Sequence, residues 1–158
     1  MAEVSLLQQR LSLYSIPLVW LTAFLPGTFK TTLIMRHTQA FTNVTPRTNG
    51  SRAAAEKNLP PDISAKILRL EGAHMNGNEN LPIWFAAIVG HIVGNMAKLD
   101  NYTLNMLSLS YICGRMLFNY IYYQQRTELQ GALRSTVFFI CFGEGFIQVH
   151  MHLDRVTN

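Results

Sequence analysis

Four long apolar stretches, separated by polar segments, dominate the chain. They run from about residue 11 to 35, from 63 to 95, from 102 to 123 and from 132 to 153. Each is at least as long as the ~20 residues that an α-helix needs to cross a bilayer. The pattern therefore predicts an all-α integral membrane protein with four transmembrane helices.

The segments between these stretches predict how the helices are arranged. The segment Arg36–Pro61 is rich in Thr, Asn, Arg, Gly and Pro, which is typical of a loop, and Pro60 and Pro61 suit the start of the next helix. The later links, near residues 98–101 and 124–131, are short. Because short links join antiparallel neighbours, we expect residues 1–158 to form a single domain, an up-down four-helix bundle.

Composition supports a membrane location and excludes other classes. Charged residues make up 14% of the chain, against about 25% in soluble domains. The net charge is +4, but the basic residues form no dense run with interleaved aromatic residues, so we do not expect nucleic-acid binding. Cys113 and Cys141 both lie within apolar stretches. Their spacing predicts neither a disulfide framework nor a metal site.

Basic residues gather on one side of the predicted membrane. That side carries Arg36, Arg47, Arg52, Lys57, Lys66, Arg126 and Arg134. The other side carries only Arg10, Lys98 and Arg155. Since Lys and Arg in short loops mark the cytosolic side, we expect the basic loops to face the cytosol and the chain ends to lie on the far side.

Polar side chains inside the predicted spans are candidate functional residues, because a charge at the bilayer centre costs at least about 3 kcal/mol. Helical periodicity places them on one face of each span. These faces carry Arg69, Gly72, Asn76, Glu79 and Ile83 in the second span, Tyr111, Arg115, Phe118 and Tyr122 in the third, and Arg134 and Ser135 at the start of the fourth. We expect them to enclose a cation-rich crevice for an anionic ligand. The alternative is structural pairing, with Glu79 neutralising an arginine. His74 points away from the polar face and is expected to contact another helix.

The string from Glu71 to Trp84, EGAHMNGNENLPIW, resembles the second-helix signature of the MAPEG family, the membrane-associated proteins of eicosanoid and glutathione metabolism. Its core is Ala-His-x-Asn-x-x-Glu followed by an apolar run with proline. Gly114-Arg115 with Tyr122 further on, and Arg134-Ser135, are also similar to the family. The segment Thr45-Pro-Arg-Thr48 is similar to fungal-type members.

The resemblance implies a homotrimer that binds glutathione between neighbouring subunits near the cytosolic face. The implied catalytic residues are Arg134, Ser135, Tyr122 and Glu79. Of these, Arg134 would stabilise the glutathione thiolate, and Ser135 is the competing candidate. The implied cofactor-binding residues are Arg69, Asn76, Glu79, Arg115, Tyr122 and Arg36. This chain departs from the family at Gly72, where many members carry an arginine for glutathione, and at Met75 and Phe118, where polar side chains are frequent.

These features predict a membrane-bound, glutathione-dependent transferase, peroxidase or isomerase acting on a lipophilic electrophile, located in the endoplasmic reticulum with its site toward the cytosol. A first alternative keeps the scaffold without glutathione, as an isomerase or cyclase that tailors a small lipophilic secondary metabolite. A second alternative is a non-catalytic protein that binds lipid or presents a partner.

Overall fold

The computed structural model describes residues 6–96 and 100–157, with the backbone alone described for residues 6, 90–96, 148, 149 and 151–157. Within this part of the chain every regular element is a helix. The elements are η1 (Leu6–Gln8), η2 (Ser12–Tyr14), α1 (Ser15–His37), η3 (Pro46–Thr48), α2 (Asn49–Ala54), α3 (Pro61–Met96), α4 (Asn101–Gln124) and α5 (Glu128–Thr157). The all-helical prediction is therefore confirmed.

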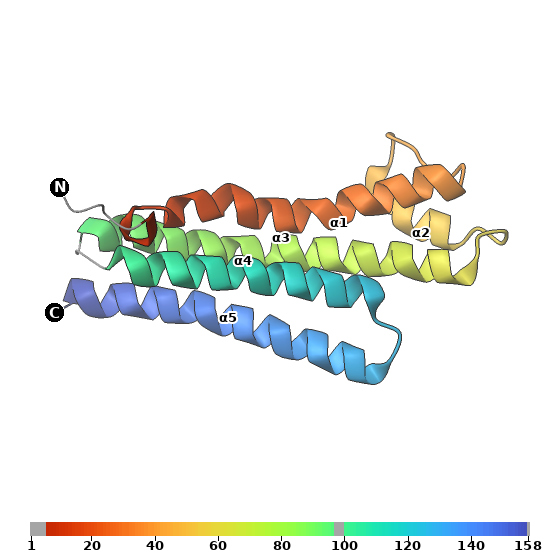
Figure 1. Ribbon diagram of the computed structural model, residues 1–158. Coiled ribbons are helices and arrows are strands. Elements are labelled where there is room, and N and C mark those ends of the chain that lie inside the picture. The colour runs from red at the N-terminus through yellow and green to blue at the C-terminus, as the bar shows by residue number, and fades with distance from the viewer. Residues whose placement is uncertain (1–5, 97–99, 158) are drawn as a thin grey trace.

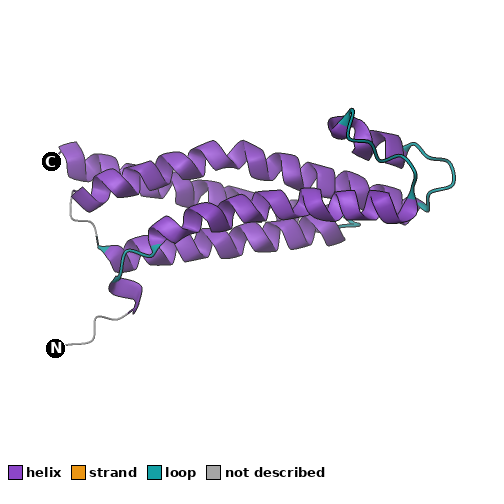
Figure 2. Ribbon diagram, turned by 90° about the horizontal axis from the view of Figure 1, so that it is seen from above, coloured by secondary structure: helices purple, strands orange, loops and turns teal. Residues whose placement is uncertain are grey.

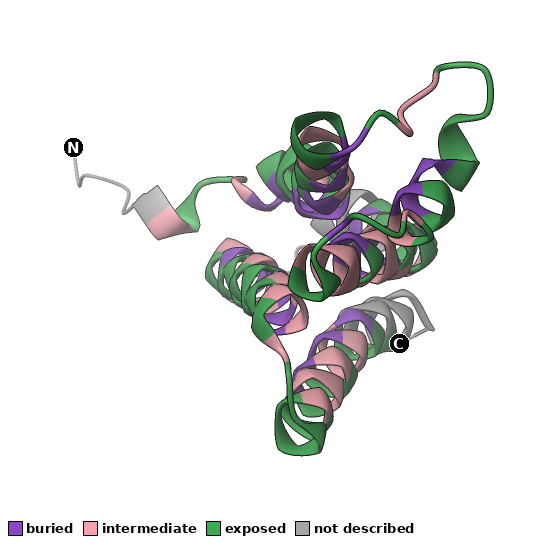
Figure 3. Ribbon diagram, turned by 90° about the vertical axis from the view of Figure 1, so that its right-hand side faces the viewer, coloured by how far each residue is buried: buried purple, intermediate pink, exposed green. Residues whose placement is uncertain are grey.

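The long helices α1, α3, α4 and α5 lie side by side, with both chain ends at one end of the bundle and α2 at the other (Figures 1 and 2). Helix α1 packs on α3 and α4, and α5 packs on the other side of α3 and α4. Seen along the bundle, buried positions face inward and exposed ones cover much of the outer surface (Figure 3). Many exposed positions are large and apolar, among them Trp20, Phe24, Phe29, Met116 and Phe139.

The four long helices cover the four apolar stretches of the sequence. Only one helix of the described part, Ser12–His37, is both long and apolar enough to cross a membrane by length and composition. The polar side chains of α3, α4 and α5 lower their apolar character, so the four crossings stay a prediction.

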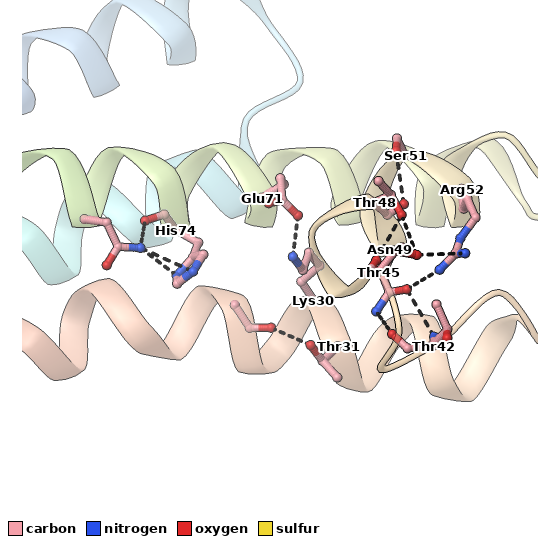
Figure 4. A network of polar contacts seen from close by, with 12 residues as sticks. Lys30, Thr31, Thr42, Thr45, Thr48, Asn49, Ser51, Arg52, Glu71 and His74 are labelled. Atoms are coloured by element: carbon pink, nitrogen blue, oxygen red, sulfur yellow. Dashed lines mark hydrogen bonds and ion pairs between the residues drawn. The ribbon is translucent and has the colours of Figure 1, made fainter.

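The segment between α1 and α3, expected to be a loop, contains η3 and α2. Asn49 is buried, and its side chain bonds both the backbone N–H and the carbonyl of Thr42 at 3.1 and 3.0 Å (Figure 4). Ala53 and Leu59 pack against Ile34 and Ile67 in a small apolar cluster. These few apolar residues pack the segment against the bundle. The segment was predicted to be a loop because most of its residues are polar.

A proline in α1 leaves a backbone carbonyl without its helical hydrogen bond, and a neighbouring helix supplies the donor. Pro26 has no N–H to bond the carbonyl four residues earlier, and that carbonyl, of Thr22, accepts a hydrogen bond from Asn119 Nδ2 of α4 at 2.7 Å. One residue on, the Ala23 carbonyl lies 2.8 Å from His74 Nδ1 of α3. His74 is thus a helix-contact residue, as predicted.

Helices α1 and α3 approach closely where small residues meet. A Cβ atom at Gly77 would lie 2.7 Å from Ala23 Cα. About two helical turns further along α1, the buried Lys30 forms an ion pair with Glu71 of α3 (Figure 4). Gly50 of α2 lies over the pair, because a Cβ there would be 2.8 Å from Glu71 Oε2. Small residues at such contacts let helix backbones come together.

At the other end of the bundle, Asp100 caps α4. Its carboxylate accepts hydrogen bonds from the backbone N–H and the hydroxyl of Thr103, both at 2.9 Å. These hydrogen bonds lower the pKa of the Asp100 carboxyl, because they favour its charged form. The cap is therefore formed at neutral pH and is lost as the pH falls through that lowered pKa.

We predict that Gly77→Ala destabilises the protein by about 1–3 kcal/mol, because its methyl group would press on the α1 backbone. Gly143→Ala in α5 is the matched control, since its Cβ meets no atom within 4 Å and helix propensity favours alanine by about 1 kcal/mol. Thermal unfolding of the purified variants in detergent measures both. A Gly77→Ala protein that melts at or above the wild-type temperature contradicts the close contact.

Candidate functional site

Helices α3, α4 and α5 enclose a cavity of about 390 Å³, a volume usual for small-molecule sites. Its lining residues are Gly72, Met75, Asn76, Glu79, Phe118, Tyr122, Arg134, Ser135, Phe138 and Phe139. Five predicted site residues therefore line this cavity: Asn76 and Glu79 of α3, Tyr122 of α4, and Arg134 and Ser135 of α5. We call it the Arg134 cavity.

Asn76 is held in place from behind by a buried cation. Arg115 of α4 is only 2% exposed, and its Nη2 donates to Asn76 Oδ1 at 3.0 Å. Asn80 Nδ2 donates to the Asn76 backbone carbonyl at 2.8 Å. Because Arg115 bonds the amide oxygen, the side-chain donors that Asn76, a lining residue, retains are its two amide N–H groups. Arg115 does not line the cavity itself and acts there through Asn76.

Arg134 places a cation against the aromatic wall of the cavity. Its Cζ lies 4.5 Å from the centre of the Tyr122 ring, a distance at which a guanidinium is attracted by the ring. Its Nη1 donates to Gln125 Oε1 at 3.2 Å. A guanidinium carries five N–H donors, so most remain for a ligand. No carboxylate of the described residues forms an ion pair with Arg134.

The Tyr122 hydroxyl occupies the space that Gly72 leaves empty. A Cβ atom at residue 72 would lie 2.3 Å from Tyr122 Oη and 2.9 Å from its Cζ. The Phe118 ring meets the Tyr122 ring edge-on, with centroids 5.5 Å apart. Gly72 replaces an arginine that many family members carry. It also has a structural role, because the absent side chain lets Tyr122 reach the α3 backbone. Its position on the polar face of the second span was the signal for this role, which the sequence analysis missed.

Glu79 is exposed at the cavity and takes no part in the ion pairs of the described residues, which join Lys30 to Glu71 and Lys66 to Asp62. The expected alternative, in which Glu79 neutralises an arginine, is thus not seen. The Ser135 hydroxyl donates to the Gly131 carbonyl at 3.1 Å.

Two predicted site residues lie apart from this cavity. Arg69 Nε donates a hydrogen bond to the Tyr123 carbonyl of α4 at 3.1 Å. Arg36 of α1 lines a second cavity, between α1 and α4. Neither residue contacts the Arg134 cavity within one chain, and their roles toward glutathione stay predictions. Met75, a position where polar side chains are frequent in the family, also lines the cavity. Phe139 lines it although sequence reasoning did not place it there, because it is an exposed, apolar position with no distinguishing pattern.

Comparison with known proteins identifies the family. Comparison with curated proteins and with solved structures gave no match. A family model described as the MAPEG family matches residues 16–146, more than four fifths of the chain, including every residue that lines the Arg134 cavity. The chain therefore belongs to the MAPEG family, whose members are membrane-associated and include glutathione transferases and related enzymes.

Proposed function

We propose that this protein is a membrane-bound, glutathione-dependent enzyme that acts on a lipophilic electrophile. The observation that carries the proposal is the cavity that joins Arg134, which pairs with no carboxylate of the described residues, with Asn76 and Glu79. Family membership agrees with transferase or isomerase chemistry of this general kind.

The groups at the cavity suit the polar groups of glutathione. Glutathione has an ammonium group, two carboxylates, peptide groups and a thiol. Glu79, which forms no ion pair with the described residues, offers a carboxylate for the ammonium group, and the Asn76 amide offers N–H donors for a carboxylate or peptide oxygen. Arg134 offers a cation for the thiolate. Together these residues match three different chemical groups of the tripeptide.

When bound, glutathione would supply the nucleophilic thiol for the electrophile. Arg134 would favour the charged sulfur and so lower the thiol pKa. The Ser135 hydroxyl already donates to Gly131, which favours Arg134 over Ser135 in this role. The Tyr122 hydroxyl can donate a hydrogen bond to developing negative charge. Phe138, Phe139 and Met75 supply an apolar wall for the substrate.

We further propose that the chain crosses the endoplasmic reticulum membrane four times and assembles as a homotrimer. The large apolar side chains on the outer surface support this, because such a surface is covered by lipid or by other subunits. The exposure of Glu79 at the cavity agrees with a site that a neighbouring subunit completes. A cytosolic position for the site follows from the basic loops, and the likeness to fungal-type members stays a prediction.

A second candidate is a glutathione-independent isomerase or cyclase acting on a small lipophilic metabolite. It is favoured by Gly72 and Met75, which leave Arg134 as the only arginine among the residues lining this cavity, beside three phenylalanines. In this case Tyr122 and Glu79 would perform the acid–base steps. Turnover that is independent of added glutathione distinguishes this candidate.

We predict that millimolar glutathione added to the purified protein gives a thiolate signal in ultraviolet absorbance, with an apparent thiol pKa below the ~8.5 of free cysteine. Arg134→Met should raise that pKa by about one unit or more, which cuts the thiolate fraction by about tenfold at a pH well below the pKa. Arg47→Met is the control, because Arg47 is an exposed cation that does not line the cavity. Absence of a thiolate signal in the wild-type protein rules out the glutathione mechanism.

We also predict that Gly72→Ala lowers kcat/KM by about tenfold, or about 1.4 kcal/mol, because the new methyl group must displace the Tyr122 hydroxyl.

Thermal unfolding of Gly72→Ala, Tyr122→Phe and the double variant measures the energetic coupling between residues 72 and 122 directly. Removing the hydroxyl relieves the closest contact, so the double variant should be more stable than the sum of the single effects predicts. Strictly additive changes would show that the two residues do not meet.

A further inference from the structure

The second cavity lies between α1 and α4 and has a volume of about 460 Å³. Its α1 residues extend from Thr22 to Arg36, which is about 21 Å at 1.5 Å per residue. The walls are mainly apolar and include Leu25, Phe29 and Leu70. It shares no lining residue with the Arg134 cavity, and α4 contributes to both. We call it the Arg36 cavity.

One end of the Arg36 cavity is cationic. Arg36 and Tyr123 both line it. Arg69 donates to the Tyr123 carbonyl at 3.1 Å, and Lys66 Nζ lies 5.9 Å from the centre of the Tyr123 ring. Arg36 thus lines the cavity itself, and two further cations, Arg69 and Lys66 of α3, contact its lining residue Tyr123. The acidic group near them is Asp62, 3.9 Å from Lys66, and Arg36 forms no ion pair with any described residue.

At the Thr22 end of the α1 wall, the Thr22 carbonyl accepts a hydrogen bond from Asn119 of α4 at 2.7 Å. Because Pro26 leaves that carbonyl without its helical donor, α4 is joined to α1 at this point. From this bond toward Arg36, successive turns of α1 line the cavity, and Pro26 itself forms part of its wall. The proline and the asparagine that compensates for it therefore both lie in the wall of the cavity.

The open side of the cavity lies on the outer surface of the bundle. Phe29, Met116 and Tyr120 line it and are 57%, 60% and 63% exposed. In a membrane these side chains would face acyl chains, so a lipid-dissolved molecule could enter sideways. An apolar channel with a cationic end matches a molecule with an apolar chain and an anionic head, and the volume suits one chain.

We propose that the Arg36 cavity binds a single-chain amphiphile with a carboxylate head, that is, a free long-chain fatty acid. The carboxylate pairs with Arg36, and the positive charges of Lys66 and Arg69 add to the attraction. The chain lies along α1 over Phe29 and Leu25 toward Asn119. The site shares no lining residue with the Arg134 cavity, and palmitate binding is measured without glutathione, so either proposal can fail without the other.

The test uses the full-length protein in lipid nanodiscs with palmitic acid that carries a diazirine in its chain. After illumination, peptides from α1 residues 22–36 and α4 residues 116–123 should carry the label, and unlabelled palmitate should compete. The methyl ester of palmitic acid, which has no charge, should compete at least tenfold more weakly. Equal competition by the ester, or label confined to other helices, overturns the proposal. A stronger competition by lysophosphatidate than by palmitate overturns the assignment of a carboxylate head.

Two pairs of variants separate the site from general effects. Arg36→Met should weaken palmitate binding about tenfold, and Arg47→Met, which removes an exposed loop cation, should not change it. Thr32→Trp should block the cavity that Thr32 lines, and Thr28→Trp, an exposed α1 position outside the cavity, should not. The thermal unfolding temperature of each variant confirms that it is folded. Equal effects within either pair contradict the site.

Discussion

The site depends on one buried interaction, the hydrogen bond from Arg115 to Asn76 across α4 and α3. A cation that is 2% exposed among apolar helices must find its partners inside the bundle, because neither lipid nor water can supply them. Asn76 meets part of that need and is thereby fixed with its N–H groups as the available donors. The polar chemistry at the Arg134 cavity thus follows from a requirement of the core.

Glycines and rings then determine the shape of the same cavity. Tyr122 is fixed by three neighbours, the Phe118 ring, the Arg134 guanidinium and the bare α3 backbone at Gly72. A larger residue at position 72 would push the hydroxyl out of this arrangement. Loss of a side chain at one helix therefore changes the position of a functional group on another, which explains how a departure from the family pattern can be part of a working site.

Helix α1 is joined to the rest of the bundle by polar bonds at successive depths. Asn119 and His74 bond carbonyls next to the proline, and Lys30 pairs with Glu71 nearer the cytosolic side predicted for the loops. Each of these residues is a candidate catalytic residue by sequence alone, because polar side chains within apolar helices are usually functional. Their contacts show that they connect α1 to α3 and α4, and the Arg36 cavity lies between α1 and α4.

The sequence by itself determined the positions of the four long helices, because apolar length and helical periodicity are local properties. It also determined which residues share a face of α3 and, through the string at Ala73–Pro82, the family. Only the tertiary structure decided which faces meet. Asn76 and Arg134 line one cavity while Arg36 lines another, because periodicity places a side chain around its own helix axis and says nothing about the neighbour it will contact. The partner is set by how the helices pack, and that depends on contacts such as Gly77 with Ala23, between residues distant in the chain.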